Sequence, residues 1–111
     1  MNYALVGYGK MGRAIEVAAA ARGHVCAAIV DRSLRGRRIA ARLDAVRWRG
    51  IAVAFEFTEP PAAKAHVVDL LGRGVAVVCG TTGWDATDLE VRRAARASKA
   101  GAVIAENFSV V

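Results

Sequence analysis

The chain has 111 residues, of which 55% are hydrophobic, and a formal net charge of +6. This size and apolar content exclude a disordered chain and predict one domain, residues 1–111, that buries roughly two-thirds of its unfolded surface. No apolar stretch approaches the ~20 residues that cross a bilayer, so no membrane partner is expected. The first apolar run begins near the start of the chain, which leaves no room for a secretory signal and predicts a cytoplasmic protein.

A glycine-rich loop follows the first predicted strand, residues 3–6. Its sequence is Gly7-Tyr8-Gly9-Lys10-Met11-Gly12, which has the GxGxxG spacing of dinucleotide-binding folds. The first glycine permits a tight turn, the second leaves room for a pyrophosphate, and the third lets the next helix pack closely on the strand. Phosphates would then lie at the helix N-terminus, where unpaired N–H groups point outward. An ordinary glycine turn is the alternative, because a chain with 11 glycines contains some GxG spacings by chance.

A helix and a second strand are expected next. The helix runs from Met11 to a basic last turn and glycine cap at Arg22-Gly23, and residues 25–30 are continuously apolar, as in a parallel strand covered on both faces. Asp31 closes this strand about 20 residues beyond the glycine loop, where a carboxylate can accept hydrogen bonds from the adenosine ribose. A plain turn residue is the alternative. Arg32 could stack on adenine or contact a 2′-phosphate, which would widen the cofactor choice from NAD to NADP.

Residues 32–49 carry a cluster of arginines. Ile39, Leu43 and Val46 have the spacing of a short helix, but Gly36 and the density of arginine are equally typical of a loop. A basic patch can bind nucleic acid, yet no helix-turn-helix, zinc-finger or paired-aromatic signature accompanies this one. We therefore interpret it as a solvated surface and expect no nucleic-acid partner.

Three further strands and two helices are predicted in the rest of the chain. Strands are expected at 51–57, 75–79 and 102–105, and helices between them. The fold class is therefore α/β, a Rossmann-type doubly wound parallel sheet of about five strands with helices on both faces. In such sheets ligands bind at the carboxyl ends of the strands, so the strand ends at Thr58 and Thr81 should face the same crevice as the glycine loop.

The two later helices have separate signals. Pro61 suits a first helical turn, and Thr87 with Glu90 has the spacing of a capping box at the start of the second helix, which should end at about Lys99. The first of these helices is expected to bury a stripe made of Ala63, Val67, Leu70 and Leu71.

Cysteine and histidine give no metal signal. Cys26 and Cys79 lie within apolar runs, which predicts buried free thiols in a reducing compartment. His24 and His66 lack metal-ligand spacing to either cysteine, so no metal site is expected.

Four motifs, in this order and spacing, resemble those of the dihydrodipicolinate reductase family, formally 4-hydroxy-tetrahydrodipicolinate reductase. They are the glycine loop, Phe55-Glu56-Phe57-Thr58, Gly80-Thr81-Thr82-Gly83-Trp84 and Asn107-Phe108-Ser109-Val110. The resemblance covers essentially the whole chain. Members of this family reduce a cyclic intermediate of diaminopimelate and lysine biosynthesis with NADH or NADPH. The resemblance implies that this chain is the amino-terminal, cofactor-binding domain of such an oxidoreductase.

The resemblance also implies a set of cofactor-binding residues. Those expected around the pyrophosphate and adenosine are Gly7, Gly9, Lys10, Met11, Gly12, Asp31 and Arg32. Those expected near the nicotinamide ribose and ring are Thr58, Gly80, Thr81, Thr82, Ala105, Glu106, Asn107 and Phe108. The family often has a longer glycine loop, and a glutamate where Asp31 stands. Because aspartate can still bind a diol with both oxygens, NAD is favoured over NADP.

The substrate half of the family has no counterpart in these residues. Its paired histidines, catalytic lysine and Ser-Gly-Thr segment follow the Asn-Phe-Ser motif, whereas here no histidine follows His66 and no lysine follows Lys99. We therefore expect the substrate domain to be absent and assign no catalytic residue. Such a fragment would bind the dinucleotide without turnover, and its uncovered apolar surface could promote self-association.

Two functions of other classes remain as alternatives. One is a stand-alone regulatory Rossmann module that senses a nucleotide, which would need no catalytic half. The other is a nucleic-acid-binding domain that uses the arginine cluster.

Overall fold

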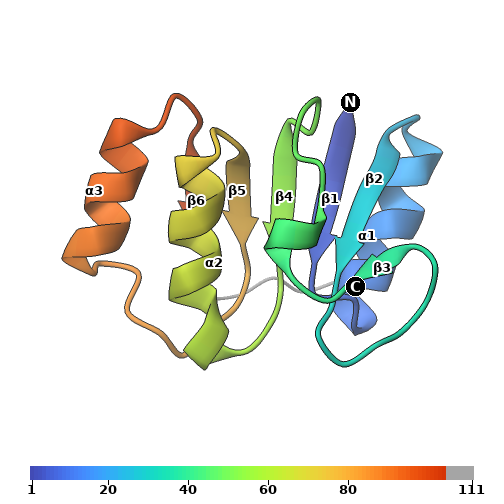
Figure 1. The fold of residues 1–111 in the computed structure, drawn as a ribbon, viewed down its shortest axis with the longest axis horizontal. Helices are drawn as coiled ribbons and strands as arrows, with labels where there is room; N and C mark the ends of the chain where they lie inside the picture. Colours follow the sequence, from blue (N-terminus) through green and yellow to red (C-terminus); the bar gives the residue numbers. More distant parts are fainter. Residues whose placement is uncertain (105–111) are drawn as a thin grey trace.

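The computed structural model describes residues 1–104. Its centre is a six-stranded sheet in the order β3-β2-β1-β4-β5-β6, with every neighbouring pair parallel (Figure 1). The strands are β1 (Asn2–Val6), β2 (Val25–Val30), β3 (Ile39–Ala40), β4 (Val53–Glu56), β5 (Ala76–Cys79) and β6 (Ala102–Ile104). This order is that of the doubly wound Rossmann fold, in which the direction of winding reverses between β1 and β4. The predicted fold class is confirmed, with one strand more than the five expected.

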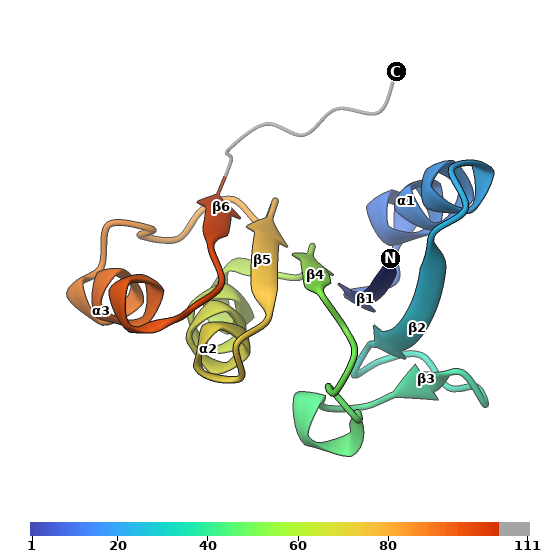
Figure 2. The ribbon, with the colours of Figure 1, turned by 90° about the horizontal axis from the view of Figure 1, so that it is seen from above.

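Within the described residues, three α-helices cover the two faces of the sheet. They are α1 (Lys10–Ala21), α2 (Pro60–Gly72) and α3 (Leu89–Ala97). Figure 2 shows α1 on one face and α2 with α3 on the other. The two faces bury different residues of the same strands because side chains alternate along a strand: Tyr3 and Leu5 lie in the cluster beneath α1, and Ala4 and Val6 in the cluster beneath α2.

Helix α2 packs as its sequence pattern predicts. Its first turn begins with Pro60 and Pro61, which lose no hydrogen bond there because those N–H groups have no intrahelical partner. The buried side chains of the helix are at most 1% exposed, and they are Ala63, Val67, Leu70 and Leu71. This stripe holds α2 against β4 and β5 and thereby places its first two turns beside the ligand edge of the sheet.

Strand β2 is less buried than a strand covered on both faces. Val25 is 56% exposed, and only Ile29 and Val30 are fully buried. The reason lies in the outer neighbour, because β3 pairs with Ile29 and Val30 alone and leaves residues 25–28 without a strand on that side. Cys26 is accordingly only partly buried, whereas Cys79 is buried as predicted, and both are free thiols.

The arginine-rich segment forms neither of the two predicted structures as a whole. Ile39 and Ala40 form β3, and a single 3₁₀ turn, η1 (Leu43–Ala45), follows. Of the apolar residues that suggested a helix, Ile39 lies in the edge strand β3, and Leu43 and Val46 pack in the hydrophobic core on one face of the sheet. Trp48 closes the segment: its indole is buried, and Nε1 donates to the Leu43 carbonyl at 2.9 Å.

The predicted cap of α3 is wrong by one residue. Asp88 is the N-cap, and its carboxylate accepts from the Glu90 amide at 2.8 Å. The Thr87 hydroxyl instead donates to Asp85 at 2.6 Å, and the Thr87 amide donates to the same carboxylate oxygen at 2.9 Å. Lys64 of α2 lies 3.1 Å from both Asp88 and Glu90, so the start of α3 is also tied to α2. The helix ends at Ala97, two residues before the predicted end.

Candidate cofactor-binding site

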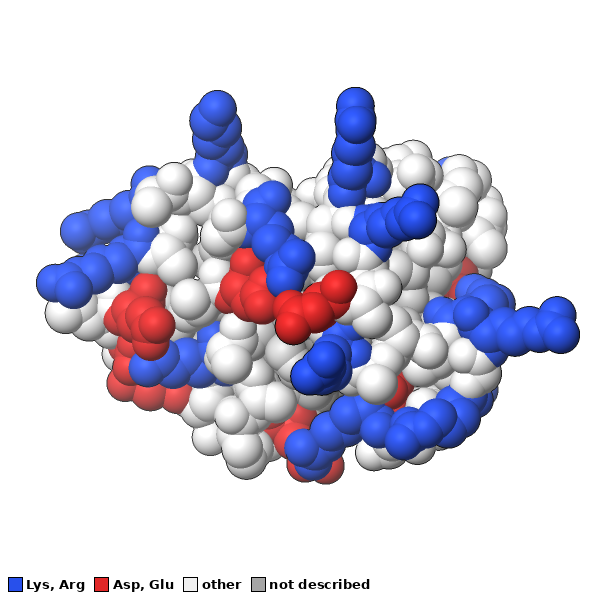
Figure 3. Space-filling model, viewed as in Figure 1, with Lys and Arg blue, Asp and Glu red and all other residues white. Residues whose placement is uncertain are grey.

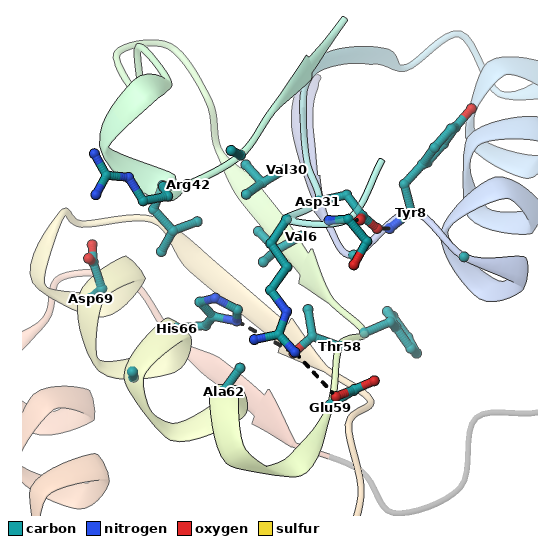
Figure 4. A pocket seen from close by; sticks show the side chains of 18 of the residues that line it. Val6, Tyr8, Val30, Asp31, Arg42, Thr58, Glu59, Ala62, His66 and Asp69 are labelled. Atoms are coloured by element: carbon teal, nitrogen blue, oxygen red, sulfur yellow. Dashed lines mark hydrogen bonds and ion pairs between the residues drawn. The ribbon is translucent and has the colours of Figure 1, made fainter. Parts of the chain in front are cut away.

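A pocket of about 540 Å³ opens at the carboxyl ends of β1, β2 and β4. Its walls are the end of β1 and the glycine loop (residues 6–9), the end of β2 and the turn after it (30–33), residues 41–44 at η1, residues 57–59 after β4, and one side of α2 (Figure 4). It lies at the point where the winding of the sheet reverses, which is where ligands bind in doubly wound folds. The predicted convergence of strand ends is therefore present for the glycine loop, Asp31 and Thr58.

The three glycines of the loop have different roles. Gly7 adopts φ +97°, and a Cβ there would lie 2.1 Å from the Phe57 carbonyl oxygen. A Cβ on Gly12 would lie 2.6 Å from the Gly7 carbonyl oxygen, so this glycine permits the close approach of α1. Gly9 has φ −90° and nothing within 4 Å of its Cβ position. Its missing side chain therefore serves no internal packing and leaves open space at the start of α1.

The start of α1 presents free backbone donors and a cation. Gly9 is the N-cap and makes no side-chain cap, so the first N–H groups of the helix are not taken by a capping side chain. Lys10 is exposed in the first turn, and Met11 is partly buried beside it. The N-terminal end of the helix dipole and the Lys10 ammonium both favour an anion here.

Asp31 connects the glycine loop to the turn after β2. Its Oδ2 accepts from the Tyr8 amide at 2.9 Å, and its Oδ1 accepts from the Ser33 and Leu34 amides at 2.9 and 3.1 Å. Burial acts to raise the pKa of Asp31, but these backbone donors outweigh it, and the pKa lies below its ordinary value. The turn role of Asp31 is thus real. A carboxylate has about four acceptor positions, so one remains for a ligand.

Arg32 and Glu59 face each other across the rim of the pocket. The guanidinium and the carboxylate are 3.7 Å apart, and both side chains are at least three-quarters exposed. A pair this exposed contributes little to stability. Its position matters more, because the one cation predicted to meet a 2′-phosphate is paired with a carboxylate from α2's N-cap.

A buried glutamate underlies Thr58 and Thr81, and the sequence reasoning did not assign it a role. Glu56, the last residue of β4, is 0% exposed. Its carboxylate accepts from the hydroxyls of Thr58 and Thr81, from the Cys79 thiol at 3.5 Å, and lies 2.7 Å from His66 Nδ1. A charged residue within an apolar strand run was the available signal, since such a residue is rarely fully buried without partners.

The partners of Glu56 change its acidity and that of its neighbour. Burial acts to raise the pKa of Glu56, but the hydrogen bonds from His66, Thr58 and Thr81 outweigh burial and lower it. Burial, followed by the negative charge of Glu56, raises the pKa of the Cys79 thiol to about 12. Glu56 is therefore the anion of this group, and Cys79 is an unreactive thiol donor.

The other predicted residues after β5 are placed differently from one another. Gly80 packs on the Phe57 ring, where a Cβ would lie 2.0 Å from the ring edge. Thr81 is 6% exposed, and its oxygen accepts from the Thr58 amide at 2.8 Å, whereas Thr82 is exposed. The four predicted residues beyond β6 lie outside the described part of the chain, and they are Ala105, Glu106, Asn107 and Phe108.

Positive and negative side chains are mixed on the face of the molecule that Figure 3 shows. Figure 3 shows Lys and Arg side chains distributed over the visible face with acidic side chains among them. Arg73 is paired with Asp69 and Asp44, and Arg38 with Glu16.

Within residues 1–104, no group of three or more His, Cys, Asp or Glu is arranged to hold a metal ion. None of the helices described is both long and apolar enough to cross a membrane.

Comparison with known proteins identifies the family. The model of the family described as "Dihydrodipicolinate reductase, N-terminus" matches residues 1–108. The 4-hydroxy-tetrahydrodipicolinate reductase of Christiangramia forsetii is 30% identical over 110 residues, which cover 99% of this chain and 43% of that protein. The corresponding protein of Geobacillus thermodenitrificans is 31% identical over 118 aligned positions, 92% of this chain and 44% of the relative. A shorter match, 44% identical over 61 residues, is to the Chromobacterium violaceum protein.

The chain thus spans less than half the length of the two relatives that match nearly all of it. Its glycine loop, Asp31 and the Thr58 strand end lie together at the ligand edge of a Rossmann sheet. On these grounds, the chain belongs to the dihydrodipicolinate reductase family and matches its amino-terminal region.

Proposed function

We propose that this chain is the NAD(P)H-binding domain of a 4-hydroxy-tetrahydrodipicolinate reductase and serves the hydride-donor side of that reaction in lysine biosynthesis. The observation that carries the proposal is the open glycine loop. Gly9 leaves space at the start of α1, beside a pocket that also contains Asp31. These features fit a dinucleotide for two reasons. The backbone can approach a pyrophosphate at the start of α1, and Asp31 follows β2, where Rossmann folds carry the carboxylate that binds the ribose.

The residues proposed to hold the cofactor divide into two groups. Lys10 and the amides after Gly9 would hold the pyrophosphate, and Asp31 the adenosine ribose. Thr58 and the residues after β5 and β6 would lie along the nicotinamide half, because that half follows the other side of the winding reversal. The bound nicotinamide supplies the hydride, and the chain's part is to bind and orient it.

The proposal is tested by titrating the purified 111-residue chain with NADH and with NADPH and following nicotinamide fluorescence or heat. Saturable one-site binding is expected. We also propose that the chain alone does not turn over the family substrate, since these residues contain no counterpart of the family's histidine, lysine and Ser-Gly-Thr set. Steady oxidation of NADH or NADPH with that substrate would contradict this second part, and absence of binding would contradict the first.

Two accompanying proposals concern location and association. The free thiols of Cys26 and Cys79 favour a reducing compartment, the cytoplasm.

Val103 of β6 is 60% exposed, and Phe55 and Val78 are partly exposed on the sheet. This apolar surface would suit the substrate domain of the family, or a second copy of the chain when that domain is missing. Sedimentation at increasing concentration tests the latter, and a monomer throughout would contradict it.

Asp31→Asn is expected to weaken NADH binding by about tenfold. An amide cannot accept from Tyr8 on one side and from Ser33 and Leu34 on the other, so either the glycine loop or the following turn loses its partner. The matched control is Asp44→Asn, which removes the same charge from the same pocket. Isothermal titration should show nearly unchanged affinity for the control; equal effects of the two variants would contradict a specific role for Asp31.

Glu59→Gln is expected to shift cofactor preference towards NADPH by about threefold, while NADH affinity changes little. The substitution removes the carboxylate that pairs with Arg32 and leaves the guanidinium available for a 2′-phosphate. Arg32→Gln is the opposing control and should lower NADPH affinity alone. The ratio of the two dissociation constants is measured for each variant at one ionic strength. An unchanged ratio in both variants would place the 2′-position away from this ion pair.

A further inference from the structure

Thr58 lies on the pocket wall with both of its hydrogen-bond donors already used. Its amide donates to Thr81 Oγ1 at 2.8 Å, and its hydroxyl donates to Glu56 Oε2. The side chain is only partly buried and borders the pocket, where Figure 4 shows it beside His66. A hydroxyl whose proton is engaged retains lone pairs alone. Towards a ligand, Thr58 therefore offers an acceptor and no donor.

The acceptor of that proton cannot itself reach a ligand. Glu56 is fully buried, and its two oxygens meet four donor groups: Thr58 and His66 at Oε2, Thr81 and Cys79 at Oε1. This number equals the acceptor positions of a carboxylate. The donors come from the ends of β4 and β5 and from α2, so the carboxylate is held in one orientation. It contributes to the pocket only through the groups that it orients.

We propose that Glu56 is a positioning residue of the cofactor site, which makes Thr58 accept a hydrogen bond from a ribose hydroxyl or amide of the dinucleotide. The inference rests on the proposed function and adds the direction of one hydrogen bond to it: the cofactor donates and Thr58 accepts. Phosphate oxygens have no proton to donate at this point, and they would face both the Thr58 lone pairs and the Glu56 charge. In this proposal the end of β4 at Thr58 binds a nucleoside part of the dinucleotide, and the start of α1 binds its phosphates.

Glu56→Gln tests the proposal because it reverses the direction of this hydrogen bond with almost no change in shape. The new amide can place its nitrogen at the Oε2 position most easily, since the partly exposed Thr58 hydroxyl can turn outward and His66 can change tautomer. At Oε1 it would leave the Thr81 proton buried without an acceptor. Thr58 would then point a donor into the pocket. NADH affinity is expected to fall about tenfold, measured by titration calorimetry.

A double-mutant cycle with Thr58→Val separates positioning from mere structural support. If Glu56 acts through the hydroxyl, Glu56→Gln weakens binding in the Thr58 background and has no further effect once valine replaces Thr58. Thr58→Ser, which keeps the hydroxyl, should retain affinity. Cys79→Ser is the matched control, because it preserves a donor to the same carboxylate without touching Thr58, and it should bind NADH normally. Unchanged affinity in Glu56→Gln, or strictly additive effects in the cycle, would overturn the inference.

A second measurement uses the unaltered chain and does not depend on the folding of Glu56→Gln. A hydroxyl proton held by a buried carboxylate exchanges slowly enough to be observed by NMR, and the Thr58 hydroxyl signal should persist when the chain is saturated with NADH. Its loss or transfer to a cofactor oxygen would overturn the inference while leaving the proposed function intact. Failure of the unaltered chain to bind any nicotinamide dinucleotide would overturn both.

Discussion

Gly7→Ala is expected to lower the free energy of unfolding by about 3 kcal/mol or more. Two independent costs act at this position. The backbone has φ +97°, where a side chain is strained, and the new Cβ would lie 2.1 Å from the Phe57 carbonyl oxygen. That oxygen belongs to the backbone and cannot rotate away. Relief would require β1 and β4 to separate at their carboxyl ends, where the pocket begins.

Gly9→Ala is the matched control for this prediction. Its φ is −90°, and nothing lies within 4 Å of the Cβ position, so the thermal midpoint should change little. NADH affinity should nevertheless fall, because a methyl group would occupy the space in which we propose the pyrophosphate binds. Urea denaturation and NADH titration of both variants give the comparison. Equal stability losses in the two variants would contradict a structural role for Gly7 that Gly9 lacks. Full NADH affinity in Gly9→Ala would show that the pyrophosphate does not bind beside Gly9.

Glu56→Ala is expected to lower the free energy of unfolding by about 3 kcal/mol near neutral pH. The substitution leaves a cavity at the end of β4 and deprives the Thr81 hydroxyl, which is buried, of its acceptor. It also releases His66 of α2 and Cys79 of β5 from a shared partner. The ends of β4 and β5 and the second turn of α2 should therefore loosen together. Amide hydrogen exchange would show this as faster exchange confined to these elements.

This stability loss should depend on pH. The folded pKa of Glu56 lies below its ordinary value of 4.5, so its contribution is complete above that value and disappears as pH falls through the folded pKa. The difference in unfolding free energy between the unaltered chain and Glu56→Ala should shrink as the pH falls below about 5. Asp31 also has a lowered pKa and is present in both proteins, so its titration largely cancels in the difference. A difference that grows on acidification would show that the buried carboxyl is protonated in the folded chain.

Much of the fold could be predicted because its signals are local. The apolar runs of β1 and β5, the stripe of α2 and the glycine loop each depend on the order of nearby residues, and each is where the sequence places it. Predictions were less successful where the outcome depended on which other segment or side chain a residue contacts. Val25 is exposed because β3 is short, and Asp88 rather than Thr87 caps α3 because Asp85 engages the threonine.

The candidate site divides in the same way. The amino-acid sequence alone determined that this is a Rossmann chain with a glycine-rich loop after β1, a carboxylate after β2 and the motifs of a reductase family, because each is a short pattern of residue types. Only the tertiary structure decided which of those residues contact one another: Asp31 accepts from the Tyr8 amide of the glycine loop, Arg32 is paired with Glu59, and Glu56 accepts from the Thr58 hydroxyl. These are contacts between strand ends and a helix far apart in sequence. The direction of a hydrogen bond depends on which partner the fold brings within reach, and a linear pattern does not contain that information.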